Sequence, residues 1–140
     1  MLVHINDCIF CKIVNGQIPS VKVFENEDVI AILDISPLNF GHTLVLPRAH
    51  FEFFDDCPDD TLADVVTVCA KVAKAVRNAV SADGYNIVCN NGKAAGQLVG
   101  HVHFHIIPRF SGDGIFDCWP AKKYEAGQTD KILGKIKAKI

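Results

Sequence analysis

Three histidines, His101, His103 and His105, alternate with apolar residues in the segment GHVHFHIIPR. Successive side chains of a β-strand point to opposite faces, so the three imidazoles would share one face and the apolar residues the other. An imidazole titrates near neutral pH, and a neutral imidazole is a good nucleophile at phosphorus. An ordinary solvent-facing strand would carry Thr, Lys and Glu instead. The spacing therefore predicts a strand with a chemically reactive face.

Cys8 and Cys11 form a C-x-x-C pair near the start of the chain. Two thiolates at this spacing can bind one metal ion, and a tetrahedral zinc site needs two more ligands. Otherwise the two cysteines are free or redox-active, beside a hydrogen-bonded pair of histidines, His50 and His101. A thioredoxin-like role would need a βαβ context, which this chain lacks. The candidate histidine ligands are His4, His42, His50 and His101.

The elements that would position these groups follow from hydrophobic periodicity and from glycine and proline breaks. They are a helix at 8–15, a hairpin of strands at 21–25 and 29–33, strands at 43–46 and 85–90, and a long helix at about 60–80. A glycine-bearing loop, NNGKAAGQLVG, leads into the histidine strand. Because the strands come mostly as sequence neighbours with one long helix inserted, we expect an α+β fold with an antiparallel sheet.

Composition and length indicate one globular domain, residues 1–140. Hydrophobic residues make up 49% of the chain and charged residues 21%, and the net charge of -2 argues against a nucleic-acid partner. No apolar run approaches the roughly 20 residues that would cross a bilayer, so we expect no membrane partner. The N-terminus does not resemble a secretory signal, which indicates a cytoplasmic location.

Residues 111–140 form a C-terminal extension beyond a core of about 7–110. Ile132, Ile136 and Ile140 give residues 129–140 the spacing of a short amphipathic helix with a lysine-bearing face. Such a helix could bind a membrane or a partner, but docking on its own domain is the expectation.

The histidine segment resembles the signature of the histidine-triad (HIT) family of nucleotide hydrolases and transferases, and residues 101–107 match it at every position. The segments CIFCKIVNGQIPS, DVIAILDISPLNFGHTLVLPRAH and NNGKAAGQLVGHVHFHIIPR resemble bacterial members of the Hint-like branch. Together they cover most of residues 7–110. The resemblance implies a five-stranded antiparallel sheet with one long helix, paired into a homodimer with a continuous sheet.

The resemblance also implies an activity, the hydrolysis of purine nucleoside 5'-phosphoramidates or related nucleotides. His103 would attack the α-phosphorus to form a covalent nucleotidyl-histidine, which water then hydrolyses to the nucleoside monophosphate. His105 would contact the phosphate or help to protonate the leaving group, and a backbone carbonyl would hold the tautomer of His103. No metal is required for this chemistry. The alternatives are a nucleotide-binding sensor or scaffold, a dinucleoside polyphosphate hydrolase, and an enzyme that uses the three histidines as metal ligands.

By the same resemblance, Gly96, Gln97 and Leu98 would approach the α-phosphate, with the Gln97 amide as a catalytic donor. Asn90 would touch the ribose or phosphate region, and Asp34 would accept hydrogen bonds from the ribose hydroxyls. Family members often carry Ser or Thr where this chain has Leu98, so a hydroxyl contact is absent here. The apolar slot for the base would consist of Ile9, Phe10, Ile13, Ile32, Leu33 and Ile35.

A structural zinc ion is implied as well, because many bacterial members of this branch bind zinc through a similar set of residues. In this chain the set is Cys8, Cys11, His50 and His101. His101 would then turn toward the metal while His103 faces the substrate, and a bend at Gly100 would allow this.

Overall fold

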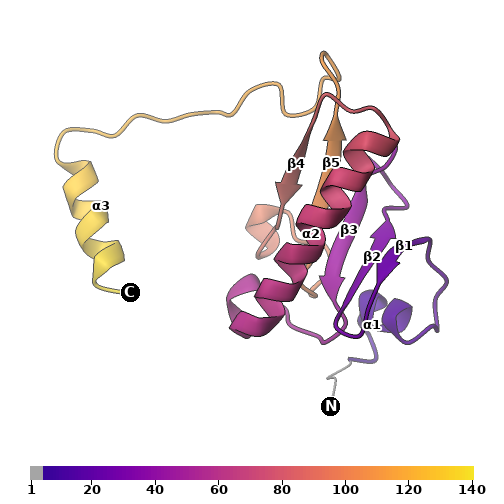
Figure 1. The fold of residues 1–140 in the computed structure, drawn as a ribbon. Coiled ribbons are helices and arrows are strands. Elements are labelled where there is room, and N and C mark those ends of the chain that lie inside the picture. The colour runs from indigo at the N-terminus through magenta and orange to yellow at the C-terminus, as the bar shows by residue number, and fades with distance from the viewer. Residues whose placement is uncertain (1–4) are drawn as a thin grey trace.

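Two helices cover opposite faces of a five-stranded antiparallel sheet in the computed structural model, which describes residues 5–140 (Figure 1). His4 lies outside the described residues. Along the sheet the strand order is β1-β2-β3-β5-β4. The strands are β1 (Lys22–Glu25), β2 (Val29–Leu33), β3 (Thr43–Pro47), β4 (Gly84–Val88) and β5 (Phe104–Arg109). The helices are α1 (Ile9–Val14), α2 (Asp59–Ala79) and α3 (Gln128–Lys137).

Alternation along the strands builds one core on each face of the sheet. Residues of one parity, such as Val45, Phe104 and Ile106, pack against the apolar face of α2. Residues of the other parity in β2 and β3, such as Ile32 and Leu44, pack against α1. The predicted α+β fold with an antiparallel sheet is confirmed, and the α1 face is left to hold the site.

Ile106 tests the packing under α2, because its side chain is completely buried there. Replacing it with alanine is expected to lower the free energy of unfolding by about 2–4 kcal/mol, since apolar area is lost and a cavity remains. Urea unfolding measures the change. Val66→Ala is the matched control, because Val66 is about half exposed on α2, and its effect should stay within about 0.5 kcal/mol. Equal effects of the two substitutions would contradict this account of the core.

The histidine strand starts later than predicted. Strand β5 begins at Phe104, so only His105 of the three histidines lies within it. The β3–β5 ladder ends at the pair Val45–Phe104. Continuing it would bring Pro47 into register, but proline has no N–H to donate, and the Pro47 carbonyl instead accepts a hydrogen bond from the His101 ring. The segment before β5 pairs with a loop, through a bond from the Val102 N–H to Phe51 O.

A hydrogen-bonded turn follows β5. The Arg109 guanidinium donates to both carboxylate oxygens of Asp113 and to the carbonyl of Ile115. These bonds hold the pKa of Asp113 well below its usual range, the Arg109 bond contributing most. Arg109 also lies over the ring of Phe116, 5.6 Å from its centroid. The turn thereby places Phe116 beside the sheet, at the start of the C-terminal extension.

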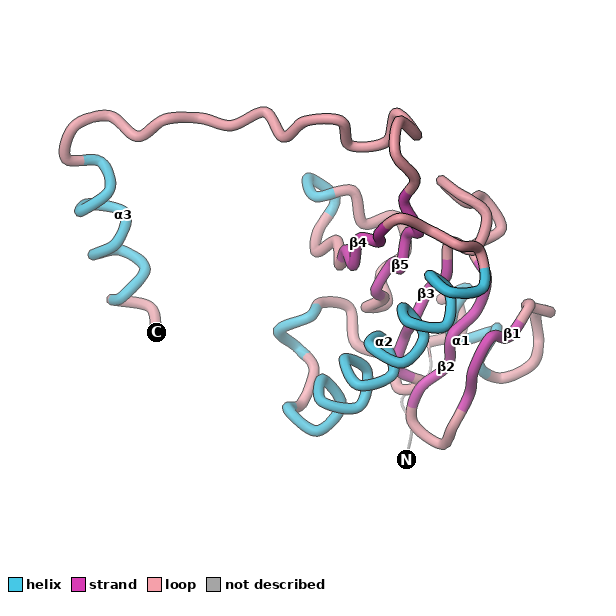
Figure 2. The backbone as a smooth tube through the Cα atoms, turned by 45° about the horizontal axis from the view of Figure 1, so that its top comes forward, coloured by secondary structure: helices cyan, strands magenta, loops and turns pink. Residues whose placement is uncertain are grey.

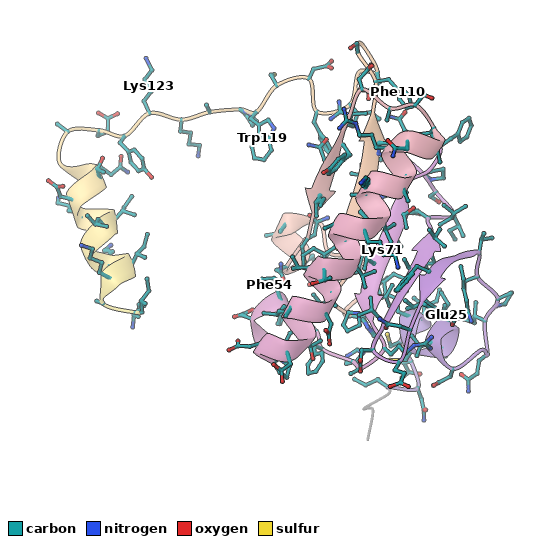
Figure 3. All side chains as sticks on the ribbon, viewed as in Figure 1. Glu25, Phe54, Lys71, Phe110, Trp119 and Lys123 are labelled. Atoms are coloured by element: carbon teal, nitrogen blue, oxygen red, sulfur yellow. The ribbon has the colours of Figure 1, made fainter. Side chains whose placement is uncertain are left out.

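Beyond this turn the chain leaves the body of the protein. An extended segment carrying Trp119 and Lys123 leads to α3, which stands apart from the sheet in both views (Figures 1, 2 and 3). The predicted helix is therefore confirmed, but the expectation that it docks on its own domain is wrong in this structure. Leu133 and Ile136 of α3, and Ile140 beyond its end, are exposed, and no other element among residues 5–140 covers them. No helix among residues 5–140 is long and apolar enough to cross a membrane.

Candidate functional site

A pocket of about 680 Å³ opens on the α1 side of the sheet. Its walls come from α1, the ends of β2, β3 and β4, the loop of residues 90–99, and β5. His103 and His105 lie on one wall, and their ring centroids are 4.9 Å apart. Phe10 from α1 packs edge-on against the His103 ring at 4.9 Å. Two adjacent imidazoles therefore face a cavity large enough for a small organic ligand.

The protonation state of His103 follows from its hydrogen bond. Its Nδ1–H donates to the carbonyl oxygen of His101 at 2.7 Å. Since a carbonyl can only accept, the proton of the neutral ring sits on Nδ1 and Nε2 carries a lone pair. Burial lowers the pKa of His103, which favours the neutral ring. His103 is therefore a buried neutral imidazole with one unprotonated nitrogen, the state that a nucleophile requires.

The protonation state of His105 follows from a chain that begins at the backbone. The Leu38 N–H donates to His42 Nδ1 at 3.1 Å, so the proton of a neutral His42 sits on Nε2. That Nε2–H donates to His105 Nδ1 at 2.9 Å. The remaining proton of His105 is therefore on its own Nε2. The site combines an acceptor nitrogen on His103 with a donor nitrogen on His105.

His42 is the functional residue that the sequence analysis left without a role. It is buried, and its Nε2 also lies 3.6 Å from the Asp34 carboxylate. The ligand atoms of Asp34, His42 and His105 lie close enough together to hold a metal ion. A metal on His42 Nε2 would move the ring proton to Nδ1, where it would oppose the Leu38 N–H. The backbone therefore favours a hydrogen-bonded chain here over a metal site.

Burial, together with the neighbouring His103 and His42, lowers the pKa of His105 to about 4. An unfolded histidine has a pKa near 6.5, so below that pH the unfolded chain binds the proton first. Stability should therefore fall as the pH drops from about 6.5 to 4, and His42 and His103, whose pKa values are also lowered, act in the same direction. Urea unfolding between pH 4 and 7 measures this slope. His105→Asn should flatten the slope, and an unchanged slope would contradict the assignment.

Twelve of the thirteen residues expected at the nucleotide site line this pocket. The exception is Gln97. Its Oε1 accepts from the Gly92 N–H at 2.7 Å, and its Nε2 donates to Glu52 O at 2.8 Å. The Gln97 amide, which was expected to reach a phosphate, is instead hydrogen-bonded within its own loop and to the segment that follows β3. The twelve are Ile9, Phe10, Ile13, Ile32, Leu33, Asp34, Ile35, Asn90, Gly96, Leu98, His103 and His105.

The loop before the histidine segment depends on glycine at its turn. Gly96 has a φ of +87°, in the left-handed region that a side chain disfavours. A Cβ there would lie 3.7 Å from the Asn90 amide, so the strain is conformational rather than a clash. Leu98 follows and is 95% exposed, with no donor on its side chain. At the pocket rim the loop therefore offers only backbone polar groups at Gly96 and Leu98, because Leu98 stands where family members often carry the hydroxyl of Ser or Thr.

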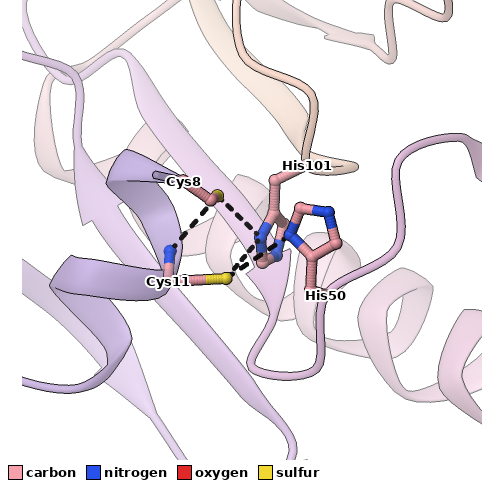
Figure 4. Close-up of side chains that lie close together, drawn as sticks. All are labelled: Cys8, Cys11, His50 and His101. Carbon is pink, nitrogen blue, oxygen red and sulfur yellow. Dashed lines mark hydrogen bonds between the residues drawn. The ribbon is translucent and has the colours of Figure 1, made fainter. Parts of the chain in front are cut away.

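Four side chains that the sequence analysis grouped together meet beside this pocket (Figure 4). Cys8 Sγ lies 3.5 Å from His101 Nδ1, and Cys11 Sγ lies 3.7 Å from His101 Nδ1 and 3.4 Å from His50 Nδ1. In a tetrahedral zinc site with Zn–S near 2.3 Å and Zn–N near 2.0 Å, sulfur and nitrogen ligands lie roughly 3.5 Å apart. The four ligand atoms are thus spaced as they would be around one metal ion.

The surroundings of the cluster orient its members. The His101 Nε2–H donates to Pro47 O at 2.9 Å, which leaves Nδ1 unprotonated and directed toward the sulfurs. This is the outer bond that metal-binding histidines usually make. Cys8 caps α1, and its sulfur accepts from the Cys11 N–H. The backbone bends at residues 99–101, which include Gly100, and His101 lies in the cluster while His103 lies in the pocket. The simple alternation, which placed all three imidazoles on one face, is therefore wrong for His101, whereas the zinc interpretation expected this separation.

Comparison with known proteins finds relatives that match most of the chain. The sequence profile of the HIT domain matches residues 15–112. An uncharacterized HIT-like protein of Methanocaldococcus jannaschii is 56% identical over 131 residues, covering 93% of this chain and 98% of that protein. An adenosine 5'-monophosphoramidase of Candida albicans is 41% identical over 138 residues, covering 95% and 91% of the two chains.

Solved structures agree with the fold. A crystal structure of a HIT family member from Bacillus subtilis superimposes with a TM-score of 0.89 at 38% identity, covering 96% of this chain and 98% of that one. A zinc-bound histidine triad family protein from Mycobacterium smegmatis superimposes with a TM-score of 0.74, also at 38% identity and with the same coverage.

Proposed function

This chain belongs to the HIT family, and on that premise we propose that it is a nucleotide hydrolase that acts at the α-phosphate of purine nucleoside 5'-phosphoramidates. The observation that best supports this proposal is that one pocket holds two imidazoles, of which one offers an acceptor nitrogen and the other a donor N–H. The acceptor nitrogen is His103 Nε2, fixed by the bond from its Nδ1–H to His101 O. The donor is His105 Nε2–H, fixed through His42. A binding protein that performs no chemistry would not require this pairing.

The reaction follows from these states. His103 Nε2 attacks the α-phosphorus. As the bond between His103 and phosphorus forms, the bond between phosphorus and the amine of the substrate breaks. The amine takes up a proton from solvent as it departs. His105 Nε2–H hydrogen-bonds a phosphate oxygen and stabilises the charge that develops on it. Water then breaks the bond between His103 and phosphorus, which releases the nucleoside monophosphate and restores the neutral ring. None of these steps uses a metal ion.

The remaining pocket residues fit a nucleotide. Asp34 lies at the end of β2 on the pocket wall, where its carboxylate can accept from ribose hydroxyls. The apolar side chains of α1 and β2, such as Phe10 and Ile32, form a slot for the base. Because apolar contacts carry little hydrogen-bond information, weak discrimination between adenine and guanine is expected.

Incubation with adenosine 5'-phosphoramidate tests the proposal, with release of AMP followed by chromatography. Guanosine phosphoramidate is expected to be turned over within roughly ten-fold of the adenosine compound, since a hydrophobic slot distinguishes related bases weakly. A dinucleoside polyphosphate serves as the competing substrate. Faster cleavage of the polyphosphate would replace the phosphoramidase assignment, and binding of AMP without any turnover would favour a nucleotide sensor.

For the cysteine–histidine cluster we propose zinc, held by Cys8, Cys11, His50 and His101. The donor set of two sulfurs and two imidazoles is one that zinc favours, and four protein ligands close the site to substrate. The ion would be structural and would tie α1 to the segment before β5. Metal analysis of protein never exposed to chelator should find about one zinc per chain, and much less than one per two chains would refute it.

We further propose that the protein forms a homodimer through β4. This strand is at the edge of the sheet, and Tyr85 and Ile87 are exposed on it. An edge strand that presents apolar side chains is suited to pair with another strand. Ile87→Lys should therefore convert dimer to monomer in light scattering. Val66→Lys places the same charge at an equally exposed apolar position on α2 and should leave the dimer intact; equal behaviour of the two variants would disprove β4 pairing.

A further inference from the structure

His101 belongs to two sites at once. Its side chain lies in the cysteine–histidine cluster, with Nδ1 3.5 Å from Cys8 Sγ, and it is completely buried. Its backbone carbonyl accepts the Nδ1–H of His103 at 2.7 Å, the bond that sets the state of the nucleophile. Any shift of this residue would therefore move the acceptor that orients His103.

Helix α1 makes a second connection. Cys8 at its N-cap and Cys11 supply the two sulfurs of the cluster, while Phe10 and Ile13 between and after them form the pocket wall. Phe10 contacts both histidines edge-on, with its ring centroid 5.8 Å from that of His101 and 4.9 Å from that of His103. The short helix α1 and its N-cap thus contribute side chains both to the cysteine–histidine cluster and to the pocket wall.

A helix this short is not stable by itself, because helices below about 12 residues are marginal in water. Its position depends on what holds it to the sheet. On one side that is the packing of Phe10 and Ile13 on β2 and β3. On the other side it is the cluster, where a bound ion would join α1 to His50 and His101.

We propose that the metal cluster and the nucleotide pocket are thermodynamically coupled through His101 and α1, so that a bound metal ion and a bound nucleotide each raise the affinity for the other. His101 acts here as a positioning residue. The inference rests on the proposed nucleotide binding, and it adds that the metal organises the pocket wall and the nucleophile rather than only the fold.

Coupling of this kind must be reciprocal, which makes it measurable from both directions. In the wild type, zinc affinity is measured by competition with a chelator in the absence and presence of saturating AMP, and AMP affinity is measured by calorimetry with apo and zinc-loaded protein. Both affinities are expected to rise by the same factor, roughly ten-fold. With Co²⁺ as the bound metal, the visible bands of the thiolate–cobalt site should shift when AMP binds.

The outcomes separate the two proposals. AMP that binds apo and loaded protein equally, with zinc affinity unchanged within two-fold and cobalt bands unmoved, overturns the coupling and leaves the proposed function standing. AMP that binds neither form overturns both. Far-UV circular dichroism of the apo protein must still show a folded sheet, because global unfolding on metal removal would mean that the effect is not carried by His101 and α1.

Two substitutions at His101 distinguish an effect of metal binding from an effect of side-chain packing. His101→Cys keeps a metal ligand and the backbone carbonyl, and it should retain zinc and most of the AMP affinity. His101→Ala removes the ligand and should lose zinc and about ten-fold in AMP affinity. Cys118→Ser, at an exposed position in the extension, is the control for both measurements. Equal AMP affinities of the cysteine and alanine variants would contradict the coupling.

Discussion

Replacing His103 with alanine is expected to lower turnover of adenosine 5'-phosphoramidate by roughly 1,000-fold or more. Among the described residues that line the pocket, no other imidazole directs an unprotonated nitrogen into it. His105 accepts at Nδ1 from His42 and so presents a proton rather than a lone pair. His101 is directed to the cysteines. The loss should appear in kcat, since His103 forms a bond only as the reaction proceeds.

AMP binding separates a chemical defect from a damaged pocket. His103→Ala should still bind AMP, because Asp34 and the apolar slot remain, and calorimetry should find an affinity within about ten-fold of the wild type. Lys74→Ala, on the exposed face of α2 across the sheet from the pocket, should leave both turnover and binding unchanged. In wild-type protein quenched at alkaline pH, where the P–N bond of a nucleotidyl-histidine survives, fragmentation of the modified peptide by mass spectrometry should place the nucleotidyl group on His103 and not on His105.

A His103→Ala variant that keeps more than a tenth of the turnover would require a different nucleophile. A nucleotidyl group found on His105 would require the reverse assignment of the two rings. Either result would contradict the chain of hydrogen bonds that begins at the Leu38 N–H and the His101 carbonyl.

Local patterns were sufficient to predict most of the helices and strands of this fold. The spacing of apolar residues predicted α2 and the hairpin of β1 and β2 because these signals lie within a few residues of one another. The start of β5 was beyond such patterns. It depends on Pro47, which is 54 residues away from His101 in sequence and ends the ladder with its missing N–H. The position of α3 was also not predictable. An amphipathic pattern indicates that one face of a helix is apolar, but it does not indicate which surface that face packs against.

At the site, the same limit explains why sequence patterns assigned His42 no role and did not indicate the hydrogen bonds that Gln97 makes. His42 faces the pocket because it precedes β3 with the parity of Leu44, which is paired directly with His105. The pairing of β3 with β5 joins residues that are far apart in the sequence, so the residues next to His42 give no indication of its role. Gln97 was expected at the phosphate because of its position in the loop, yet a rotamer that binds Gly92 and Glu52 is equally compatible with the sequence.

Removing one sulfur from the proposed zinc site should produce a larger loss of stability than any other substitution named above. Cys11 is buried, and its sulfur lies within 3.7 Å of both histidine ligands. The free energy of metal binding contributes to folding when the site is absent from the unfolded chain. Cys11→Ser is therefore expected to lose zinc and to lower the melting temperature by on the order of 10 °C, which for a domain of this size corresponds to about 3–5 kcal/mol.

The packing cost of replacing a buried thiol must be separated from the loss of the ion. Cys57→Ser supplies that control, because Cys57 is also buried but belongs to the core under α2 and not to the cluster. It should be destabilised by a smaller amount and keep its zinc. A chelator should lower the melting temperature of the wild type and of Cys57→Ser but not that of Cys11→Ser, whose cluster is already broken. Because α2 and the sheet retain their own core on the opposite face, the metal-free protein should still unfold cooperatively. A chelator that leaves the wild type unchanged would show that the four side chains hold α1 in place without an ion.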